Sequence, residues 1–461
     1  MEKLDVAQIP ADVLDVCQRL IAAGFAAHLV GGGVRDLLIG RVPNDFDVAT
    51  DALPDRVLKL FGQHFAIPTG LQHGTITVVT GTQGNQRHVE VTTYRGEGAY
   101  LDGRRPSSVN FSATLVEDLS RRDFTINAIA FDPQSGLLTD PFDGQGDIDR
   151  KLIRAVGDPV VRFTEDGLRP MRAVRQATQL GFEIDPPTLA AITQTFDSFR
   201  LVAMERIHDE LIKLLAADKP SRGIELMRVS GLLQATLPEL LEGVGCAQNR
   251  RYQHDVYHHV LAVVDEVRGR DPLVRMGALL HDIAKPRMRA EKPGEPGEYS
   301  FPQHGLLGAE LADGICKRWK MSKADRARVV AMVSQHMFDY TPEWTDGTVR
   351  RFVQRVGPDN LGDIFALREA DVAGRGLGEP RDAETCALRA RIAAVVAEDT
   401  ALSIRDLAVN GQDVMRILGV SGGRVVGQVL EKLLECVLDE PSLNTRGSLL
   451  ALIPELAATS Y

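Results

Sequence analysis

Two aspartates separated by a single residue are the first candidates for chemistry in this sequence. Asp45 and Asp47 stand at the start of the segment FDVAT, which has the composition of a β-strand. Side chains two positions apart on a strand point to the same face, so both carboxylates can bind hard divalent cations. Glu90, in the strand-like segment HVEVTTYR, would supply a third oxygen from a neighbouring strand. Two Mg²⁺ ions held in this way favour in-line phosphoryl transfer without a protein nucleophile.

A glycine turn precedes these acids. Gly31, Gly32 and Gly33 lie between a predicted strand and a predicted helix. Backbone N–H groups of glycine approach phosphates closely, and a helix N-terminus adds positive potential. Arg35 would add a charge-assisted contact to the same phosphates. The competing interpretations are a turn with two exposed acids and a flexible glycine loop.

The order of the two motifs supports the catalytic interpretation. The turn GGGVRD, residues 31–36, is followed on the next predicted strand by DFD, residues 45–47. This arrangement resembles the nucleotidyltransferase superfamily of the DNA polymerase β type. The resemblance implies an N-terminal head with a mixed sheet and helices.

A carboxylate and a guanidinium follow in the segment EDGLR. Asp166 and Arg169 are three residues apart, so on one helix they would share a face. Such a pair presents an acceptor beside a donor, which complements the exocyclic amine and ring nitrogen of cytosine or adenine. Uracil and guanine present the reverse pattern and would leave buried polar groups unpaired. The alternative is an ordinary surface ion pair on a helix.

The segment RRDFTIN, residues 121–127, adds donors and acceptors suited to a ribose. With the preceding motifs it resembles the class II tRNA nucleotidyltransferases, the CCA-adding enzymes, and the related bacterial poly(A) polymerases, over residues 25–240. The resemblance implies metal binding by the paired aspartates, ribose contacts from Arg122 and Asp123, and base reading by Asp166 and Arg169. It also implies CTP, ATP and the tRNA 3′ end as substrates. The nucleotide-binding candidates are Gly32, Arg35, Arg122, Asp123, Asn127, Asp166, Arg169, Arg172 and Arg175.

Three further segments refine the resemblance. The segment PTGLQHGT, residues 68–75, is similar to CCA-adding members and lacks the Gly, Arg, Arg, Phe cluster associated with poly(A) polymerases. Residues 95–109, around Asp102, resemble the flexible loop that CCA-adding enzymes need for the terminal A, although an ordinary hairpin loop has the same composition. The segment ERIHDEL, residues 205–211, resembles a neck element that supports the helices rather than reacting.

A second group of side chains suits metal binding. The order H…HD…H…H…D on predicted helices resembles the HD phosphohydrolase superfamily, with the candidate ligands His259, His281, Asp282, His304, His336 and Asp371. Imidazole with carboxylate suits a divalent transition metal or Mg²⁺, and a metal-bound water attacks phosphoesters. Lys285, one helical turn after His281, could contact the phosphate. Residues 402–434 look like the C-terminal region of members that carry such a unit, where they would hold tRNA.

The composition sets limits on these interpretations. The chain has 461 residues, 44% hydrophobic and 25% charged, with a formal net charge of −10. Such an acidic chain does not coat nucleic acid non-specifically, so we expect local RNA contacts at arginine clusters. The absence of a signal-like start or a long apolar run predicts a cytoplasmic protein that does not enter membranes. Five scattered cysteines, without CxxC pairs, are expected to be small core residues.

The hydrophobic periodicity of the sequence predicts the strands and helices that position these residues. We expect strands at residues 46–50, 75–81, 88–95 and 108–116, helices at 11–22 and after the glycine turn, and an almost wholly helical chain after residue 155. The fold class is therefore α+β in the head and all-α beyond it. The predicted divisions are a head at 1–155, a helical neck at 156–245, an HD unit at 246–375 and a C-terminal helical region at 376–461.

The leading hypothesis is a CCA-adding enzyme with a second, hydrolytic site. Alternatives within the family are a poly(A) polymerase and a CC-only or A-only enzyme. A nucleotidyltransferase that modifies a regulatory protein, coupled to an HD unit that removes the modification, belongs to another functional class. A non-catalytic RNA-binding module is the remaining alternative.

Overall fold

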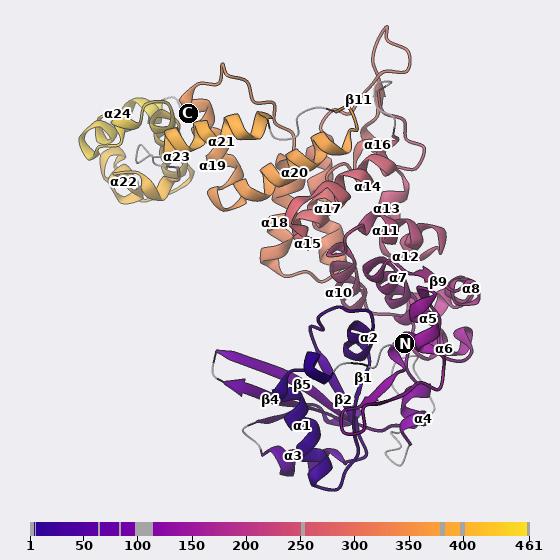
Figure 1. Cartoon of the computed structure of the whole chain (residues 1–461). Helices are drawn as coiled ribbons and strands as arrows, with labels where there is room; N and C mark the ends of the chain where they lie inside the picture. The colour runs from indigo at the N-terminus through magenta and orange to yellow at the C-terminus, as the bar shows by residue number, and fades with distance from the viewer. Residues whose placement is uncertain are drawn as a thin grey trace. The chain divides into compact units, whose positions relative to one another are not determined.

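The computed structural model describes residues 4, 6–62, 65–82, 84–96, 114–249, 254–378, 383–396 and 402–458. The chain divides into two compact units, residues 1–238 and 239–461 (Figure 1). None of the helices within the described residues combines the length and the apolar character needed to cross a membrane. Each unit is described by itself below.

The first unit contains a seven-stranded mixed sheet in the order β3-β4-β5-β2-β1-β6-β7. The neighbours β2 and β5 run parallel, whereas the other pairs are antiparallel. This sheet confirms the α+β head expected from the sequence. Its strands are β1 (Ala27–Val30), β2 (Phe46–Thr50), β3 (Ala66–Gly70), β4 (Thr75–Thr82), β5 (Asn85–Thr93), β6 (Ala130–Asp132) and β7 (Leu137–Thr139).

One face of the sheet is covered by α1 (Ala11–Ala22) and α3 (Pro54–Phe61), as Figure 1 shows. Alternate residues of β2, Phe46 and Val48, are buried in this apolar layer with the buried face of α1. Asp47 lies between them in the strand and therefore points to the other face. The helix α2 (Gly32–Leu38) follows β1 directly, so the glycine turn is placed at the end of a central strand.

The fourth predicted strand is wrong where the structure describes it. Thr114 is an N-cap and α4 (Leu115–Ser120) follows, with a reciprocal capping box between Thr114 and Glu117. The two hydrogen bonds of this box satisfy backbone N–H groups that a helix start leaves free, which favours a helix over a strand. Residues 108–113 of that prediction lie outside the described residues.

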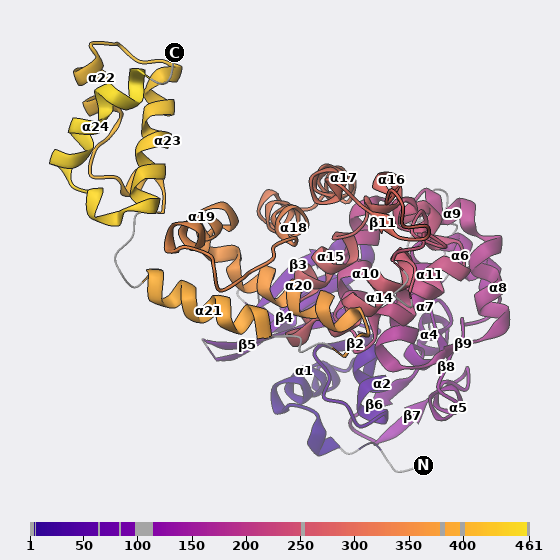
Figure 2. The same ribbon diagram turned by 90° about the horizontal axis from the view of Figure 1, so that it is seen from above.

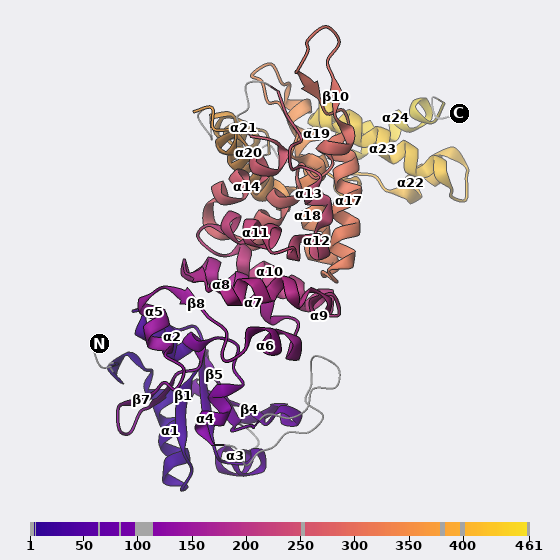
Figure 3. The same ribbon diagram turned by 90° about the vertical axis from the view of Figure 1, so that its right-hand side faces the viewer.

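The remainder of the first unit is helical, with a two-stranded parallel sheet between β8 (Leu152–Ile153) and β9 (Glu183–Ile184). Helix α7 packs against α10 and α11, and the views in Figures 1 and 3 show these helices together. The helices are α5 (Gly144–Asp149), α6 (Pro159–Glu165), α7 (Arg169–Leu180), α8 (Pro186–Gln194), α9 (Phe196–Arg200), α10 (Met204–Leu215), α11 (Pro220–Val229) and α12 (Leu232–Thr236), with α13 (Pro238–Leu241) at the boundary of the units.

The described residues of the second unit are helical apart from one hairpin. Strands β10 (Ala290–Glu291) and β11 (Tyr299–Ser300) pair antiparallel and bound the Pro- and Gly-rich loop seen in the sequence. The first helices are α14 (Val256–Glu266), α15 (Pro272–Leu280), α16 (Lys285–Met288), α17 (His304–Arg318), α18 (Lys323–Gln335), α19 (Asp346–Val356), α20 (Leu361–Gly374) and α21 (Ala383–Val396). The last three, α22 (Gly411–Leu418), α23 (Arg424–Asp439) and α24 (Arg446–Ala458), surround an apolar core of their own (Figure 2).

The cysteines only partly follow the expectation that they are core residues. Cys17, Cys246 and Cys316 are buried, and burial raises the pKa of the Cys17 and Cys316 thiols to about 12. Cys386 is exposed and Cys436 is half-buried, so for Cys386 the prediction is wrong. All five are free thiols. The division into four domains stays a prediction.

Candidate functional site

The three head carboxylates are brought together by the sheet. Asp47 on β2 is the register partner of Glu90 on the parallel neighbour β5, so both side chains point to the face opposite α1 and α3. Asp45 immediately precedes β2 and is exposed. Within the described residues, ligand sets whose atoms all lie within 4.8 Å of one another occur only in the second unit, so this group is looser.

The charge balance of this face fits a divalent cation. Burial raises the pKa of Asp47 to about 6, and the like charges of Glu90 and Asp45 add to that rise, although Arg122 opposes it. Arg172 also opposes the rise, but the pKa of Asp47 stays raised against both guanidinium groups, so negative charge is left uncompensated around this carboxylate. Oxygen ligands of this kind are those that Mg²⁺ takes in proteins.

The glycine turn lies directly against these groups. Gly31 has φ of 77°, and a Cβ atom built there would lie 3.1 Å from Asp47 Oδ2 and 3.2 Å from Arg122 Nη1. A side chain would therefore meet both strain and crowding, and only glycine fits. The predicted contact of the Gly32 N–H group with a phosphate stays a prediction.

Arg35 is held by partners within the protein. Its guanidinium donates to Asp36 at 2.7 Å, to Asn127 Oδ1 at 2.8 Å and to Gln176 Oε1 at 3.5 Å. Arg35 therefore joins the glycine helix to the segment around Asn127. A direct phosphate contact from Arg35 stays a prediction. Gln176 was missed by the sequence analysis because a lone glutamine on a helix carries no motif.

Asp123, Asn127 and Arg172 form one network, in which Asp123 and Asn127 are buried and Arg172 is half-buried. Arg172 donates to Asp123 Oδ2 at 2.6 and 2.8 Å, and Asn127 donates to Asp123 Oδ1 at 3.0 Å. Burial alone would raise the pKa of Asp123, but the charge of Arg172 and these hydrogen bonds hold it well below its usual range. Asp123 is thus a fixed anion with a fixed orientation.

The predicted geometry of the base-reading pair is wrong. Asp166 follows the end of α6 with extended backbone, at φ of −138° and ψ of 103°, and Arg169 begins α7. The two residues therefore do not share a helix face. Arg169 Nη1 donates to Glu165 and to the Arg162 carbonyl, both at 2.7 Å, whereas Asp166 faces Arg206 at 3.2 Å. Their role in base reading stays a prediction.

The arginines of α7 are each matched with an acid. Arg169 pairs with Glu165, Arg172 pairs with Asp123, and Arg175 pairs with Glu210 of α10. This series positions the helix against α6, the ribose-suited segment and α10. Residues 97–113, which include Asp102 and most of the predicted A-addition loop, lie outside the described residues.

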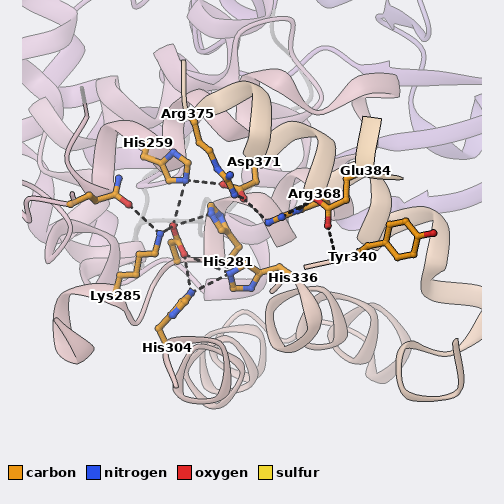
Figure 4. Close-up of polar contacts among 12 residues, drawn as sticks. His259, His281, Lys285, His304, His336, Tyr340, Arg368, Asp371, Arg375 and Glu384 are labelled. Atoms are coloured by element: carbon orange, nitrogen blue, oxygen red, sulfur yellow. Dashed lines mark hydrogen bonds and ion pairs between the residues drawn. The ribbon is translucent and has the colours of Figure 1, made fainter. Parts of the chain in front are cut away.

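The six histidine and aspartate candidates of the second unit converge, and Figure 4 shows the labelled imidazoles and Asp371 pointing toward one another. Their ligand atoms fall into two sets, each within 4.8 Å: His259, His281 and Asp371, and Asp282, His304 and His336. All six side chains are buried. They come from α14, the end of α15, the start of α17, the end of α18 and α20.

Three of these histidines are oriented by backbone carbonyls. The Nδ1 atoms of His281, His304 and His336 lie 2.7 to 2.8 Å from the carbonyl oxygens of Ala278, Phe301 and Val333. A carbonyl only accepts, so each Nδ1 carries the proton and each neutral ring keeps a lone pair on Nε2. Burial, with the neighbouring His281, lowers the pKa of His336 to about 3, so this ring is neutral near pH 7.

Asp282 lies at the centre of the cluster. Its Oδ2 atom is 3.1 Å from His281 Nε2 and 3.5 Å from His259 Nε2, and its Oδ1 atom is 3.5 Å from His304 Nε2. Neither buried oxygen has a well-formed hydrogen bond within the described residues, although Lys285 Nζ forms an ion pair with Oδ2 at 2.6 Å. Buried polar atoms left in this way fit a site built for a metal.

Cationic side chains adjoin the cluster. Lys285 also donates to Gln248 at 3.1 Å, and Arg375 donates to Asp371 Oδ2 at 2.7 Å. The predicted phosphate contact of Lys285 stays a prediction. Arg375 was missed by the sequence analysis, but its position four residues after Asp371 on a helix was a usable signal. Figure 4 shows Arg368 beside it, paired with Glu384 at 2.9 Å.

Comparisons with known proteins find similar families along three segments of the chain. Residues 27–154 match the family described as the poly(A) polymerase head domain. Residues 181–243 match an RNA- and SrmB-binding site of polymerase A, and residues 306–453 match domain 2 of tRNA nucleotidyltransferases. The fold and the carboxylate site therefore define a nucleotidyltransferase with a poly(A) polymerase-type head. Within that class, the chain is similar to the class II tRNA nucleotidyltransferases, the CCA-adding enzymes.

The similar proteins cover different shares of the chain. The CCA-adding enzyme of Levilactobacillus brevis is 46% identical over 219 residues, which are 48% of this chain and 53% of that enzyme. That of Geobacillus sp. is 47% identical over 219 residues, 48% of this chain and 52% of that enzyme. The chain thus spans about half the length of these curated relatives. The crystal structure of the Bacillus stearothermophilus CCA-adding enzyme in complex with CTP covers 97% of this chain and 98% of its own, at a TM-score of 0.71 and 29% identity.

Proposed function

We propose that this protein adds C, C and then A to the 3′ end of tRNA from CTP and ATP, without a template, and releases pyrophosphate. The observation that carries the proposal is the placement of Asp47 and Glu90 in register on one face of the sheet, with Gly31 and Arg122 against Asp47. Phosphoryl transfer depends on positioning and charge neutralisation, and this face offers both.

Asp45, Asp47 and Glu90 would hold Mg²⁺. When bound, Mg²⁺ lowers the pKa of an attacking hydroxyl and neutralises the triphosphate and the leaving pyrophosphate. Around it, Arg122 places positive charge beside Asp47, and the glycine turn brings backbone close to that carboxylate. Asp123, oriented by Arg172 and Asn127, offers a rigid acceptor to the hydroxyls of the incoming ribose.

Base choice is assigned to Asp166 and Arg169. The Asp166 carboxylate accepts from the exocyclic amine of cytosine or adenine, and Arg169 donates to the adjacent ring nitrogen. Although they do not share a helix, the residues flank one turn between α6 and α7. A base with the opposite pattern leaves these groups unpaired and is rejected.

Incorporation assays separate this function from its alternatives. Purified protein would receive CTP and ATP, singly and together, with tRNA transcripts that end at the discriminator base, at C and at CC. Stepwise addition of C, C and A supports the proposal. Homopolymeric A tails indicate a poly(A) polymerase, arrest after CC or action on CC ends alone indicates a partial enzyme, and labelling of protein but not tRNA indicates a protein-modifying enzyme. RNA binding without incorporation of any nucleotide, in any combination of nucleotide and tRNA, indicates a non-catalytic RNA-binding module.

The histidine cluster supports a second function, metal-dependent hydrolysis of phosphoesters. His259, His281, Asp282, His304, His336 and Asp371 would hold a divalent transition metal or Mg²⁺, which when bound supplies an activated water. The carrying observation is the burial of Asp282 with both oxygens lacking a well-formed hydrogen bond. Lys285 and Arg375, at the edges of the cluster, would attract the substrate phosphate.

This second function is tested on phosphomonoesters and cyclic phosphates with Mn²⁺, Co²⁺, Ni²⁺ or Mg²⁺. The variant His281→Ala with Asp282→Ala is expected to lose hydrolysis and to keep CCA addition. Hydrolysis that survives both substitutions would place the activity elsewhere.

A further inference from the structure

The carboxylate of Asp166 is oriented by a helix distant in the sequence. Arg206 on α10 places its Nη2 atom 3.3 Å from Asp166 Oδ1 and 3.2 Å from Oδ2. The Leu168 N–H group donates to Oδ1 at 3.1 Å. Within the described residues, the side chains of Asp166 and Arg169 form no hydrogen bond with each other, although the Arg169 backbone N–H donates to the Asp166 carbonyl at 3.0 Å. The Arg169 guanidinium instead donates to Glu165 and to backbone carbonyls. The carboxylate is therefore held by its own turn and by α10.

The turn that carries Asp166 is itself rigid. A Cβ atom on Gly167 would lie 2.4 Å from the Ser198 carbonyl oxygen, at the end of α9. The backbone of the turn is thus packed directly against another helix, which only glycine permits. Because the backbone of the turn is packed in this way, rotation about the side-chain torsions is the main motion left to the Asp166 carboxylate.

The helix that carries Arg206 is equally well anchored. Ile207 and Leu211 of α10 are buried, and Glu210, one turn beyond Arg206, pairs with Arg175 of α7. Arg206 consequently extends from a well-packed helix, α10, toward the well-packed turn between α6 and α7. The pair connects two elements whose backbones do not need to move.

The contact leaves Asp166 able to bind a ligand. One nitrogen is shared between both carboxylate oxygens at more than 3.1 Å, and each oxygen of an ionised carboxylate has two lone pairs. The Asp166 side chain is 24% exposed, so an amine can reach it. Arg206 therefore restrains the carboxylate without using up its capacity to accept.

We propose that Arg206 is a positioning residue for base selection, which holds the Asp166 carboxylate at the angle that accepts the exocyclic amine of cytosine or adenine. The inference rests on the proposed function, because it presumes that Asp166 reads the base. The ERIHDEL segment accordingly has a part in specificity, beyond the support of neck helices expected from the sequence. Without Arg206 the carboxylate would rotate, and the penalty against uracil and guanine would fall.

The test measures single-nucleotide addition of CTP, ATP, UTP and GTP to tRNA ending at C or CC. The variants are Arg206→Ala, Arg206→Lys, Asp166→Ala and the double variant Arg206→Ala with Asp166→Ala. Arg222→Ala is the matched control. Within the described residues, Arg222 pairs with Glu183 at 2.7 Å and donates to the carbonyls of Ala177 and Phe182, not to Asp166. Unfolding midpoints show which variants are folded.

We expect Arg206→Ala to raise the KM for CTP and lower the CTP-over-UTP ratio of kcat/KM roughly tenfold, with kcat for CTP within about twofold. The double variant should be no less selective than Asp166→Ala, since both changes remove one interaction. Arg206→Lys should restore part of the selectivity, and Arg222→Ala should keep all of it.

The outcomes separate the two proposals. If the wild-type protein adds neither C nor A to tRNA, the proposed function fails and this inference falls with it. If Asp166→Ala loses selectivity while folded Arg206→Ala keeps it, or if the two losses add in the double variant, the positioning role is overturned and the proposed function stands. Full selectivity in Asp166→Ala overturns both the base-reading assignment and the role of Arg206, while CCA addition itself remains supported.

Discussion

Under the proposed function, Asp47 is the side chain whose replacement should lower nucleotide addition most. It lies between Glu90, Arg122 and the Gly31 backbone, so replacement by the isosteric amide changes charge but little else. We expect Asp47→Asn to lower kcat for nucleotide addition at least roughly a hundredfold, because a metal ligand is worth several kcal/mol. Asp51→Asn is the control: Asp51 bonds the Ala26 N–H group at the far end of the same strand. Equal activity in both variants would remove Asp47 from the catalytic site.

The second prediction concerns Asp123 and the dependence of folding stability on pH. Its folded pKa is depressed because Arg172 and Asn127 overcome the effect of burial, so the carboxylate stabilises the fold above its unfolded pKa of about 3.9. The contribution is complete near pH 7, constant down to about pH 5, and lost as pH falls further toward the folded pKa.

The measurement compares Asp123→Asn with the wild-type protein in urea unfolding of the first unit. Arg172 keeps 37% of its side chain exposed, so we expect a loss of only about 1–3 kcal/mol near pH 7. The difference should shrink below about pH 5. A difference that grows on acidification would show that the ion pair does not stabilise the fold.

At the level of single residues, the sequence predicts which side chains share a face of a helix or strand, because that depends on the local repeat of the element. Asp47 and Glu90 lie on one sheet face, as the alternation visible in the sequence predicts, and Asp45 immediately precedes β2. The position of Asp166 was not predictable in this way, since α6 ends at Glu165 and the following turn packs through Gly167 against Ser198. Its partner Arg206 is 40 residues away, and only tertiary packing brings the two together.

The turn between α6 and α7 is the element most sensitive to a small change. Gly167→Ala would force a methyl group within 2.4 Å of a backbone oxygen, so α9 or the turn must move. We expect a loss of about 1–3 kcal/mol in stability and reduced selectivity among nucleotides, measured by urea unfolding and by the incorporation assay.

The matched substitution is Gly314→Ala within α17, where an added Cβ meets no atom within 4 Å. There the change should stabilise by about 0.5–1 kcal/mol, because alanine is the better helix former. Equal effects at the two glycines would mean that the close approach at Gly167 is not maintained in solution.

At the level of elements, the sequence predicted helices and strands correctly where the hydrophobic periodicity and the turn or capping residues indicated the same element. The helix Ala11–Ala22 and the strand, glycine turn and helix at residues 27–38 match their predictions. The error at residues 114–116 arose because β-type residues were weighed above the capping signal of Thr114 and Glu117. Short strands such as β8 and β9 could not be predicted, since two residues carry no period.

For the whole molecule, the division into two units has a thermodynamic consequence. Each unit is compact by itself, so we expect at least two calorimetric transitions on heating rather than one. CTP with Mg²⁺ should raise the first unit's transition, whereas Mn²⁺ or Co²⁺ should raise the second unit's, by binding the native histidine cluster.

The control for this assignment is the variant His281→Ala with Asp282→Ala. It should lose the shift caused by Mn²⁺ and keep the shift caused by CTP, and a chelator should reverse the metal effect in the wild-type protein alone. A Mn²⁺ shift that persists in the variant would mean that the metal binds outside the cluster.

Strand β2 also bears on how faithfully the protein folds. Phe46 and Val48 enter the apolar layer while Asp47 faces the site, so a slip of one residue against β1 or β5 would exchange them. A carboxylate placed in that layer without a partner would cost several kcal/mol, and such a chain would not stay folded. We therefore expect the fraction of molecules that are folded to equal the fraction that are catalytically competent. The strand register that buries Phe46 and Val48 is the same register that places Asp47 on the opposite face.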